Sequence, residues 1–114
     1  LNFLERVDII IEQNIDNEAF CMADLQRELL MSSSQIYRKI KQQTECSPSV
    51  YIRRQRLQYA YALIIRTDLS LSEISYRVGF NGLSYFKQRF LQSKICGSFW
   101  CLVFIAFYWS ALFF

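Results

Sequence analysis

The sequence predicts an all-α fold in which two helix-turn-helix subdomains are joined by a long linker helix and followed by an atypical apolar C-terminal tail. Three observations predict it. Apolar residues recur at three and four positions, the spacing of one helix face. One Pro and three Gly leave little room for hairpin turns. The apolar pattern of residues 25–40 returns 49 to 50 positions later, which predicts two copies of one helical unit.

The first helix is expected at about residues 1–14, where apolar and acidic side chains take opposite faces. Val7, Ile10 and Ile11 lie on the apolar face. They are three and four positions apart, so one side of this helix is expected to enter the core.

The first helix-turn-helix unit is expected at about residues 21–42. Leu25 and Leu29 mark the buried face of its first helix. Ser32 and Gln35 form the Ser-x-x-Gln pattern of a capping box, in which each side chain bonds the backbone N–H of the other residue. The second helix of the unit is therefore expected to begin just after Ser32.

A linker helix is expected at about residues 48–66. Ser47 is a capping residue, and the proline after it suits the first helical position. The second helix-turn-helix unit is expected at about residues 70–91. Ser70 opens its first helix, and Gly79 ends that helix as a left-handed cap would.

Charge divides the chain into three regions. Residues 1–31 carry a net charge of −5, residues 32–94 carry +8, and residues 95–114 carry no charged side chain. A strongly basic middle region favours a polyanionic partner. The uncharged end needs a separate explanation.

The composition also excludes most catalysts. The chain contains no histidine, so a Ser-His-Asp triad, a Cys-His pair and the zinc sites that need histidine are impossible. The four cysteines form no CxxC pair and are expected to be reduced thiols in a cytoplasmic protein. We therefore expect no enzyme, no cofactor and no bound metal.

Two long stretches resemble the DNA-binding domain of AraC/XylS-type transcriptional regulators. MADLQRELLMSSSQIYRKIKQQTECSPSVYIRRQRLQYAYALI is similar to the first unit and linker helix of that family, and DLSLSEISYRVGFNGLSYFKQRF to its second unit. The resemblance covers about residues 3–91, within an expected domain of residues 1–94. It implies two helices that enter successive major grooves of double-stranded DNA, with the linker helix matching one duplex turn of roughly 34 Å.

In the first recognition helix, polar residues share the face opposite Ile36 and Ile40. The resemblance implies base reading by Ser34, Tyr37 and Arg38. Arg38 is the strongest candidate because its fork can take guanine O6 and N7 together. The residues expected at phosphates are Ser32, Ser33, Lys39 and Lys41.

In the second recognition helix, the positions that match are Leu83, Ser84, Lys87 and Gln88. Gln88 suits adenine and Lys87 suits guanine or a phosphate, while Asn81 and Arg89 are expected to touch the backbone. In the linker, Arg53, Arg54 and Arg56 are expected to support helix packing, with at most one reaching a phosphate. A solvated helix face explains any single basic residue equally well, so the prediction rests on the set.

The chain departs from the resembled family in three places. Leu30 stands where the family usually has glycine, so a left-handed turn there would cost about 1 kcal/mol. Gly82 and Leu83 replace an acid and a proline at the second turn. The largest departure is the end of the chain, ICGSFWCLVFIAFYWSALFF, where the family has a basic loop and a short closing helix.

The tail at residues 95–114 admits three explanations. Its 20 uncharged residues just reach the length that spans a bilayer. It is therefore a membrane anchor or partner-binding tail, the product of a changed reading frame, or a divergent closing helix. An apolar run of this kind also favours self-association or membrane association.

The sequence as a whole therefore predicts the DNA-binding output module of a bacterial transcription regulator. The first residue is not methionine, so an upstream sensor, receiver or ligand-binding domain is expected outside this chain. The alternatives are a tail-anchored membrane protein with a cytoplasmic helical domain and a truncated, non-functional relative.

Overall fold

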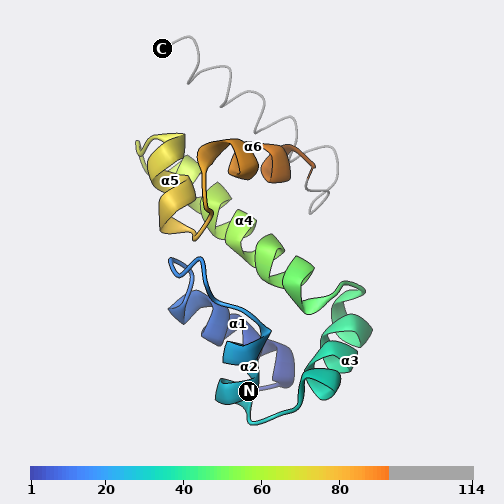
Figure 1. Cartoon of the computed structure of the whole chain (residues 1–114). Coiled ribbons are helices and arrows are strands. Elements are labelled where there is room, and N and C mark those ends of the chain that lie inside the picture. Colours follow the sequence, from blue (N-terminus) through green and yellow to red (C-terminus); the bar gives the residue numbers. More distant parts are fainter. Residues whose placement is uncertain (93–114) are drawn as a thin grey trace.

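The computed structural model describes residues 1–92, and within them every regular element is an α-helix, as Figure 1 shows. The helices are α1 (Phe3–Gln13), α2 (Met22–Leu29), α3 (Ser33–Thr44), α4 (Pro48–Arg66), α5 (Leu71–Arg77) and α6 (Leu83–Gln92). The predicted all-α class is confirmed, and each predicted helix lies within a few residues of its expected place.

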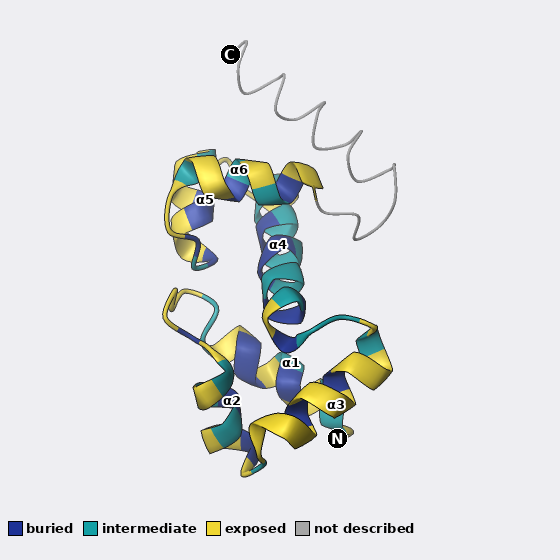
Figure 2. Cartoon of the chain, turned by 45° about the vertical axis from the view of Figure 1, so that its right-hand side comes forward, coloured by how far each residue is buried: buried dark blue, intermediate teal, exposed yellow. Residues whose placement is uncertain are grey.

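The helices gather around the two halves of α4, which runs through the middle of the molecule (Figure 1). Helices α1, α2 and α3 pack with the start of α4 around one hydrophobic core, in which Leu25, Ile36 and Ile40 are fully buried. Helices α5 and α6 pack with the rest of α4 around a second core that contains Ile74 and Phe86. Figure 2 shows these buried positions on the sides of the helices that face one another.

Three serines begin helices where the sequence predicts them. The Ser32 hydroxyl accepts the Gln35 backbone N–H, and the Gln35 side chain accepts the Ser32 N–H, so the capping box is complete. Ser70 is also an N-cap, because its hydroxyl accepts the Glu73 backbone N–H. The Glu73 carboxylate pairs with Arg77 and does not accept the Ser70 backbone N–H, so this capping box is incomplete. Ser47 is the N-cap of α4, but its hydroxyl pairs with the Ser49 hydroxyl at 3.4 Å and makes no capping bond to a backbone N–H; the proline at the first position, with its fixed φ, suits the helix start.

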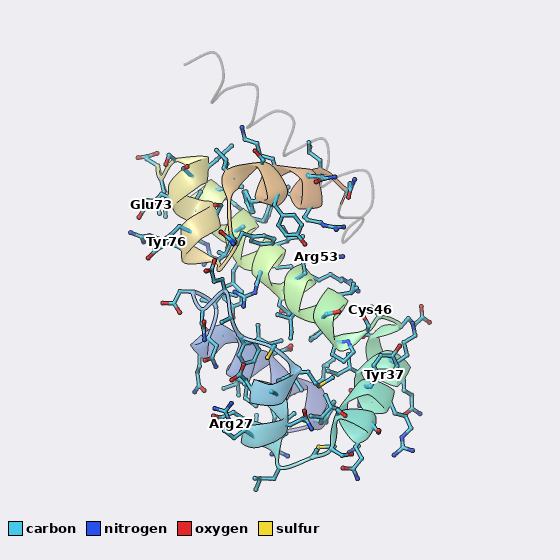
Figure 3. The ribbon with its side chains drawn as sticks, viewed as in Figure 1. Arg27, Tyr37, Cys46, Arg53, Glu73 and Tyr76 are labelled. Atoms are coloured by element: carbon cyan, nitrogen blue, oxygen red, sulfur yellow. The ribbon has the colours of Figure 1, made fainter. Side chains whose placement is uncertain are left out.

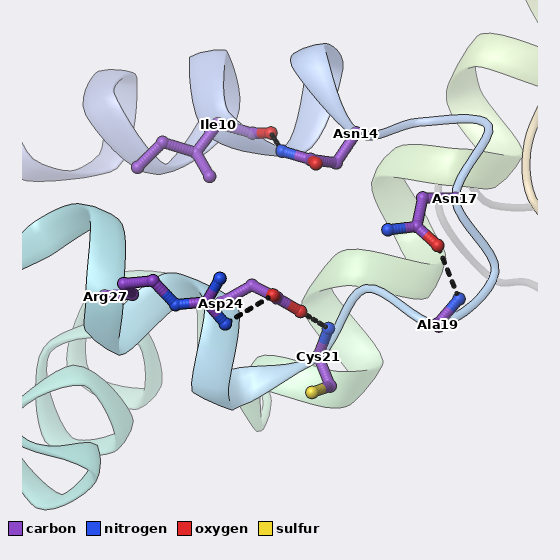
Figure 4. A network of polar contacts seen from close by, with 7 residues as sticks. All are labelled: Ile10, Asn14, Asn17, Ala19, Cys21, Asp24 and Arg27. Carbon is purple, nitrogen blue, oxygen red and sulfur yellow. Dashed lines mark hydrogen bonds and ion pairs between the residues drawn. The ribbon is translucent and has the colours of Figure 1, made fainter.

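Helix α2 begins at a weaker cap, which Figure 4 shows. Cys21 is its N-cap, and the Asp24 carboxylate accepts the Cys21 backbone N–H at 2.9 Å. This backbone hydrogen bond, together with the nearby Arg27, holds the pKa of Asp24 below its usual value. Cys21 and Asp24 thus stand in the positions of a capping box, in which the Asp24 carboxylate holds the backbone N–H of the cap residue.

Among residues 1–92 four positions have a positive φ, namely Leu30, Glu45, Gly79 and Gly82. Leu30 follows α2 with φ 55° and ψ 42°, although its side chain is 90% exposed and gains little from burial. Gly79 follows α5 with φ 82°, as the sequence predicts. Leu30 therefore holds a conformation that costs an L-residue roughly 1–2 kcal/mol.

Arg56 ties the two halves of the molecule together from the middle of α4. The side chain is only 6% exposed. Its guanidinium donates to the carbonyl oxygens of Ile15, of Asn17 at 2.8 Å and of Val78 at 2.9 Å. Burial lowers the pKa of Arg56, and the charge of Asp16 opposes this effect. The expected packing role of this arginine is confirmed.

The three explanations for residues 95–114 concern a segment that lies outside the described residues. Among residues 1–92, no helix is both long and apolar enough to cross a membrane.

Candidate nucleic-acid interface

Helix α3 presents one polar face and one buried face. Ile36 and Ile40 are completely buried in the first core. On the opposite side the exposed residues are Ser34, Tyr37, Arg38 and Lys41, spaced by three, four and seven positions. Tyr37 keeps 48% of its surface exposed, and the Lys41 ammonium lies 3.3 Å from the Glu45 carbonyl oxygen at the end of the helix. Helix α3 therefore presents the Tyr37 ring, the Arg38 guanidinium and the Lys41 ammonium on one accessible face.

The structure does not bring Lys39 to this face. Its ammonium lies 5.2 Å from the centroid of the Phe3 ring in α1, which is a cation–π distance. Its position on the helix is about 100° beyond Arg38, so the side chain turns toward α1. Ser32 and Ser33 are both exposed at the start of α3, where backbone N–H groups favour anions.

Helix α6 repeats this arrangement with one difference. Ser84 and Gln88 are exposed on its outer side, Lys87 is half-buried beside them, and Asn81 is exposed just before the helix. Leu83 is not an outward position. It is half-buried and packs against the second core, because an apolar side chain at the first helical position gains more from the core than from solvent.

Arg89 and Tyr85 form a second polar group on the flank of α6. The Arg89 guanidinium carbon lies 5.2 Å from the centroid of the Tyr85 ring, and its Nε is buried without a hydrogen-bond partner among the described residues. Burial by itself would raise the pKa of Tyr85. Hydrogen bonds to Arg89 and Arg53, and the charges of these two arginines, outweigh it and lower that pKa. Tyr85 thus joins α6 to α4.

Arg53 lies part-way along α4, between Tyr37 of α3 and helix α6, as Figure 3 shows. Sequence reasoning expected Arg53 to support helix packing, with at most one of the three linker arginines reaching a phosphate, and assigned nothing to Tyr85. The one available signal was the spacing of Tyr85 and Arg89, which are one helical turn apart. The partnership with Arg53 depends on contact between segments 32 residues apart and has no local signature.

A family described as a helix-turn-helix domain matches residues 25–94, which include both units and the helix between them. Among curated relatives, histidine kinase P4 of Formosa agariphila is 34% identical over 87 residues, which are 76% of this chain and 6% of that protein. The HTH-type transcriptional regulator ExsA of Pseudomonas aeruginosa is 29% identical over 93 residues, 82% of this chain and 33% of that protein. The chain thus spans a third or less of these two relatives.

Solved structures show the same fold. The C-terminal domain of the two-component response regulator yesN from Fusobacterium nucleatum superposes with a TM-score of 0.70 and 27% identity, covering 81% of this chain and 95% of that one. The DNA-binding domain of AdpA, a global transcriptional factor solved with a target DNA, gives a TM-score of 0.73 at 22% identity over 94% and 92% of the two chains.

The kinase is an enzyme as a whole protein, but the part that matches is a small fraction of it. ExsA is named a transcriptional regulator, and RhaS of Citrobacter koseri, which is 33% identical over 73 residues, is named a transcriptional activator. Together with the matched family, the paired recognition helices and the shared fold, this establishes that the chain belongs to the AraC-type helix-turn-helix family of DNA-binding domains.

Proposed function

We propose that this domain binds promoter DNA sequence-specifically and is the output module of a bacterial transcription regulator. Helices α3 and α6 enter successive major grooves on one side of the duplex. The observation that carries the proposal is the exposed face of α3, which Ser34 shares with an arginine, a lysine and a tyrosine, while Ile36 and Ile40 on the opposite face are fully buried. Helix α4, with 19 residues, rises about 28 Å, comparable to the roughly 34 Å of one duplex turn.

Base reading and phosphate binding fall to different residues. In α3, Ser34, Tyr37 and Arg38 read base edges, with Arg38 on a guanine. In α6, Gln88 reads an adenine and Lys87 a guanine or a phosphate, with Ser84 beside them. The residues that contact the DNA backbone are Ser32, Ser33, Lys41, Asn81 and Arg89. Lys39 contacts Phe3 and is not included.

The test is binding of the full 114-residue chain to duplex DNA across a salt series. A duplex enriched from a randomised pool by the wild-type chain serves as specific DNA, and a random duplex as its comparison. Arg38→Ala is expected to weaken specific binding by about 1–3 kcal/mol and to relax the preference at one base pair. Lys41→Ala is expected to weaken binding to both duplexes and to lower the salt slope by about one.

Arg66→Ala is the matched control. Arg66 is an exposed arginine in the last turn of α4, and the proposal gives it no contact with DNA. Equal losses of affinity for Arg38→Ala on specific and random DNA would refute base reading by Arg38. No salt-dependent binding by the folded wild-type chain would refute the function itself.

We further propose that this domain works as one part of a longer regulator. The chain spans only 33% of ExsA, and the yesN neighbour is the C-terminal domain of a response regulator. These facts support an upstream sensor, receiver or ligand-binding domain that controls the DNA-binding module. They also support action in the cytoplasm, where bacterial DNA lies.

A further inference from the structure

A cavity of about 760 Å³ lies between the two helix-turn-helix units. Its walls come from the loop before α2, from α3, from the first two turns of α4 and from the segment that joins α5 to α6. Tyr37 and Asn81 both line it. Since these residues belong to the two proposed DNA-contacting surfaces, the cavity lies between those surfaces.

Two arginines line the cavity, and only one of them offers its charge to a ligand. The guanidinium of Arg56 is already bonded to the three carbonyl oxygens of Ile15, Asn17 and Val78. Arg53, one helical turn earlier, is half-buried and lines the same cavity as Tyr85 of α6, whose phenol its charge influences. Arginine has five N–H donors, so one phenolic oxygen leaves most of them available.

Tyr85 places a second arginine beside the first. The Arg89 guanidinium carbon lies 5.2 Å from the centroid of its ring. Against the effect of burial, the charges of Arg89 and Arg53 lower the pKa of its hydroxyl. The buried Nε of Arg89 has no partner among residues 1–92, although a buried donor without a partner is costly. Arg53, which shares the cavity with Tyr85, and Arg89, which lies over the Tyr85 ring, thus bring two positive charges to one tyrosine at the point where α6 meets α4.

If α3 and α6 enter successive major grooves, the DNA backbone between those grooves passes close to the point where α6 meets α4. Between two major grooves on one side of B-DNA lies a minor groove, which is bounded by the phosphates of both strands. The planar fork of arginine matches the oxygens of a phosphate, and a tyrosine hydroxyl is a common phosphate donor.

We propose that Arg53, Tyr85 and Arg89 form a binding site for a DNA backbone phosphate midway between the two recognition helices. The linker helix is then a DNA contact as well as a spacer. This inference rests on the proposed function and adds to it a specific contact with the non-read centre of the operator.

The first test is the salt dependence of binding of the full chain to random duplex. Arg53→Ala is expected to lower the salt slope by about one and to weaken binding about tenfold, because one phosphate contact is lost. Arg53→Lys is expected to restore the slope but only part of the affinity, because lysine keeps the charge and lacks the fork. Arg66→Ala on the same helix is expected to change neither. Thermal unfolding of each variant establishes that it is folded.

The second test locates the phosphate. Uncharged methylphosphonate linkages are placed one at a time along a duplex selected by the wild-type chain. One such linkage, between the two major grooves that α3 and α6 enter, is expected to lower the DNA affinity of the wild-type chain as much as Arg53→Ala lowers it on unmodified DNA. The same linkage is expected to cause no further loss of affinity in Arg53→Ala. Tyr85→Phe is expected to weaken binding severalfold at an unchanged slope.

The outcomes separate this site from the proposed function. If the wild-type chain binds DNA with a steep salt dependence but Arg53→Ala behaves like Arg66→Ala, the site is wrong and the function stands. The site would also be wrong if, at every linkage position, the affinity loss caused by the linkage added to the loss caused by Arg53→Ala. Absence of DNA binding by the folded wild-type chain would overturn both.

Discussion

Gly79→Ala is expected to destabilise the protein far more than Gly82→Ala, although both glycines have a positive φ. The φ values are 82° and 106°, so an alanine is strained at either position by roughly 1–2 kcal/mol. Gly82 has no heavy atom within 4 Å of an added Cβ, so strain is the whole effect there. At Gly79 the added Cβ would lie 1.8 Å from Nη1 of Arg56 and 2.6 Å from the carbonyl oxygen of Ile15.

Neither neighbour of Gly79 can move away easily. The Ile15 oxygen is backbone, and the Arg56 guanidinium is held by three carbonyl oxygens. Displacing it leaves buried acceptors unpaired, at about 1–3 kcal/mol each. The total for Gly79→Ala is therefore at least about 3 kcal/mol, against about 1 kcal/mol for Gly82→Ala once the gain from a less flexible unfolded chain is included.

Thermal unfolding followed by circular dichroism measures this difference on the full chain. Since 1 kcal/mol shifts the melting temperature of a domain of this size by about 4–8 °C, Gly79→Ala is expected to lower it by at least about 12 °C and Gly82→Ala by about 4–8 °C. Equal shifts for the two variants would refute the reasoning, because they would mean that Arg56 does not occupy the space beside Gly79.

Three further predictions concern stability. Arg56→Met is expected to lower the free energy of unfolding by about 3–5 kcal/mol in urea titrations, because buried carbonyl acceptors lose their donor; a loss below 1 kcal/mol would contradict this role. Leu30→Gly is expected to raise that free energy by about 0.5–1 kcal/mol by relieving the left-handed backbone, whereas Glu28→Gly inside α2 is expected to lower it by a similar amount. Burial and the bond to Asp8 raise the pKa of Tyr51 well above its ordinary 10.0. The stabilisation that the protonated Tyr51 gives to the folded state is therefore complete below about pH 10 and is lost as the pH rises further. Alkaline unfolding of Tyr51→Phe is therefore expected to be less steep than that of the wild type, and identical profiles would contradict the effect.

Local sequence signals predicted the helices and their caps because each signal and its consequence lie within a few residues. The capping box of Ser32 and Gln35 closes over three positions, and the buried face of α3 follows from the spacing of Ile36 and Ile40. The resemblance likewise marked Leu30 as a glycine position, and its φ of 55° shows why glycine suits that turn.

Side-chain directions that depend on distant segments could not be predicted in this way. Lys39 has the charge of a phosphate ligand, yet its ammonium lies over Phe3, which is 36 residues earlier in the chain. Leu83 matched an outward position by number, but the second core holds it. In both cases the sequence gives the residue type, and tertiary packing decides which surface the side chain reaches.

Helix α4 connects the two helix-turn-helix units, and under our proposal it also contacts the DNA backbone. Arg53 and Arg56 are three positions apart and therefore neighbours on the helix surface. Arg56 turns into the interior, where it donates to carbonyl oxygens of the loop between α1 and α2 and of Val78 after α5, and these bonds tie both halves of the molecule to α4. Arg53 lines the cavity between the units and meets Tyr85 of α6 there. A change that loosens Arg56 would therefore also move α6 relative to Arg53, so stability and phosphate binding are expected to be coupled through this one turn of helix.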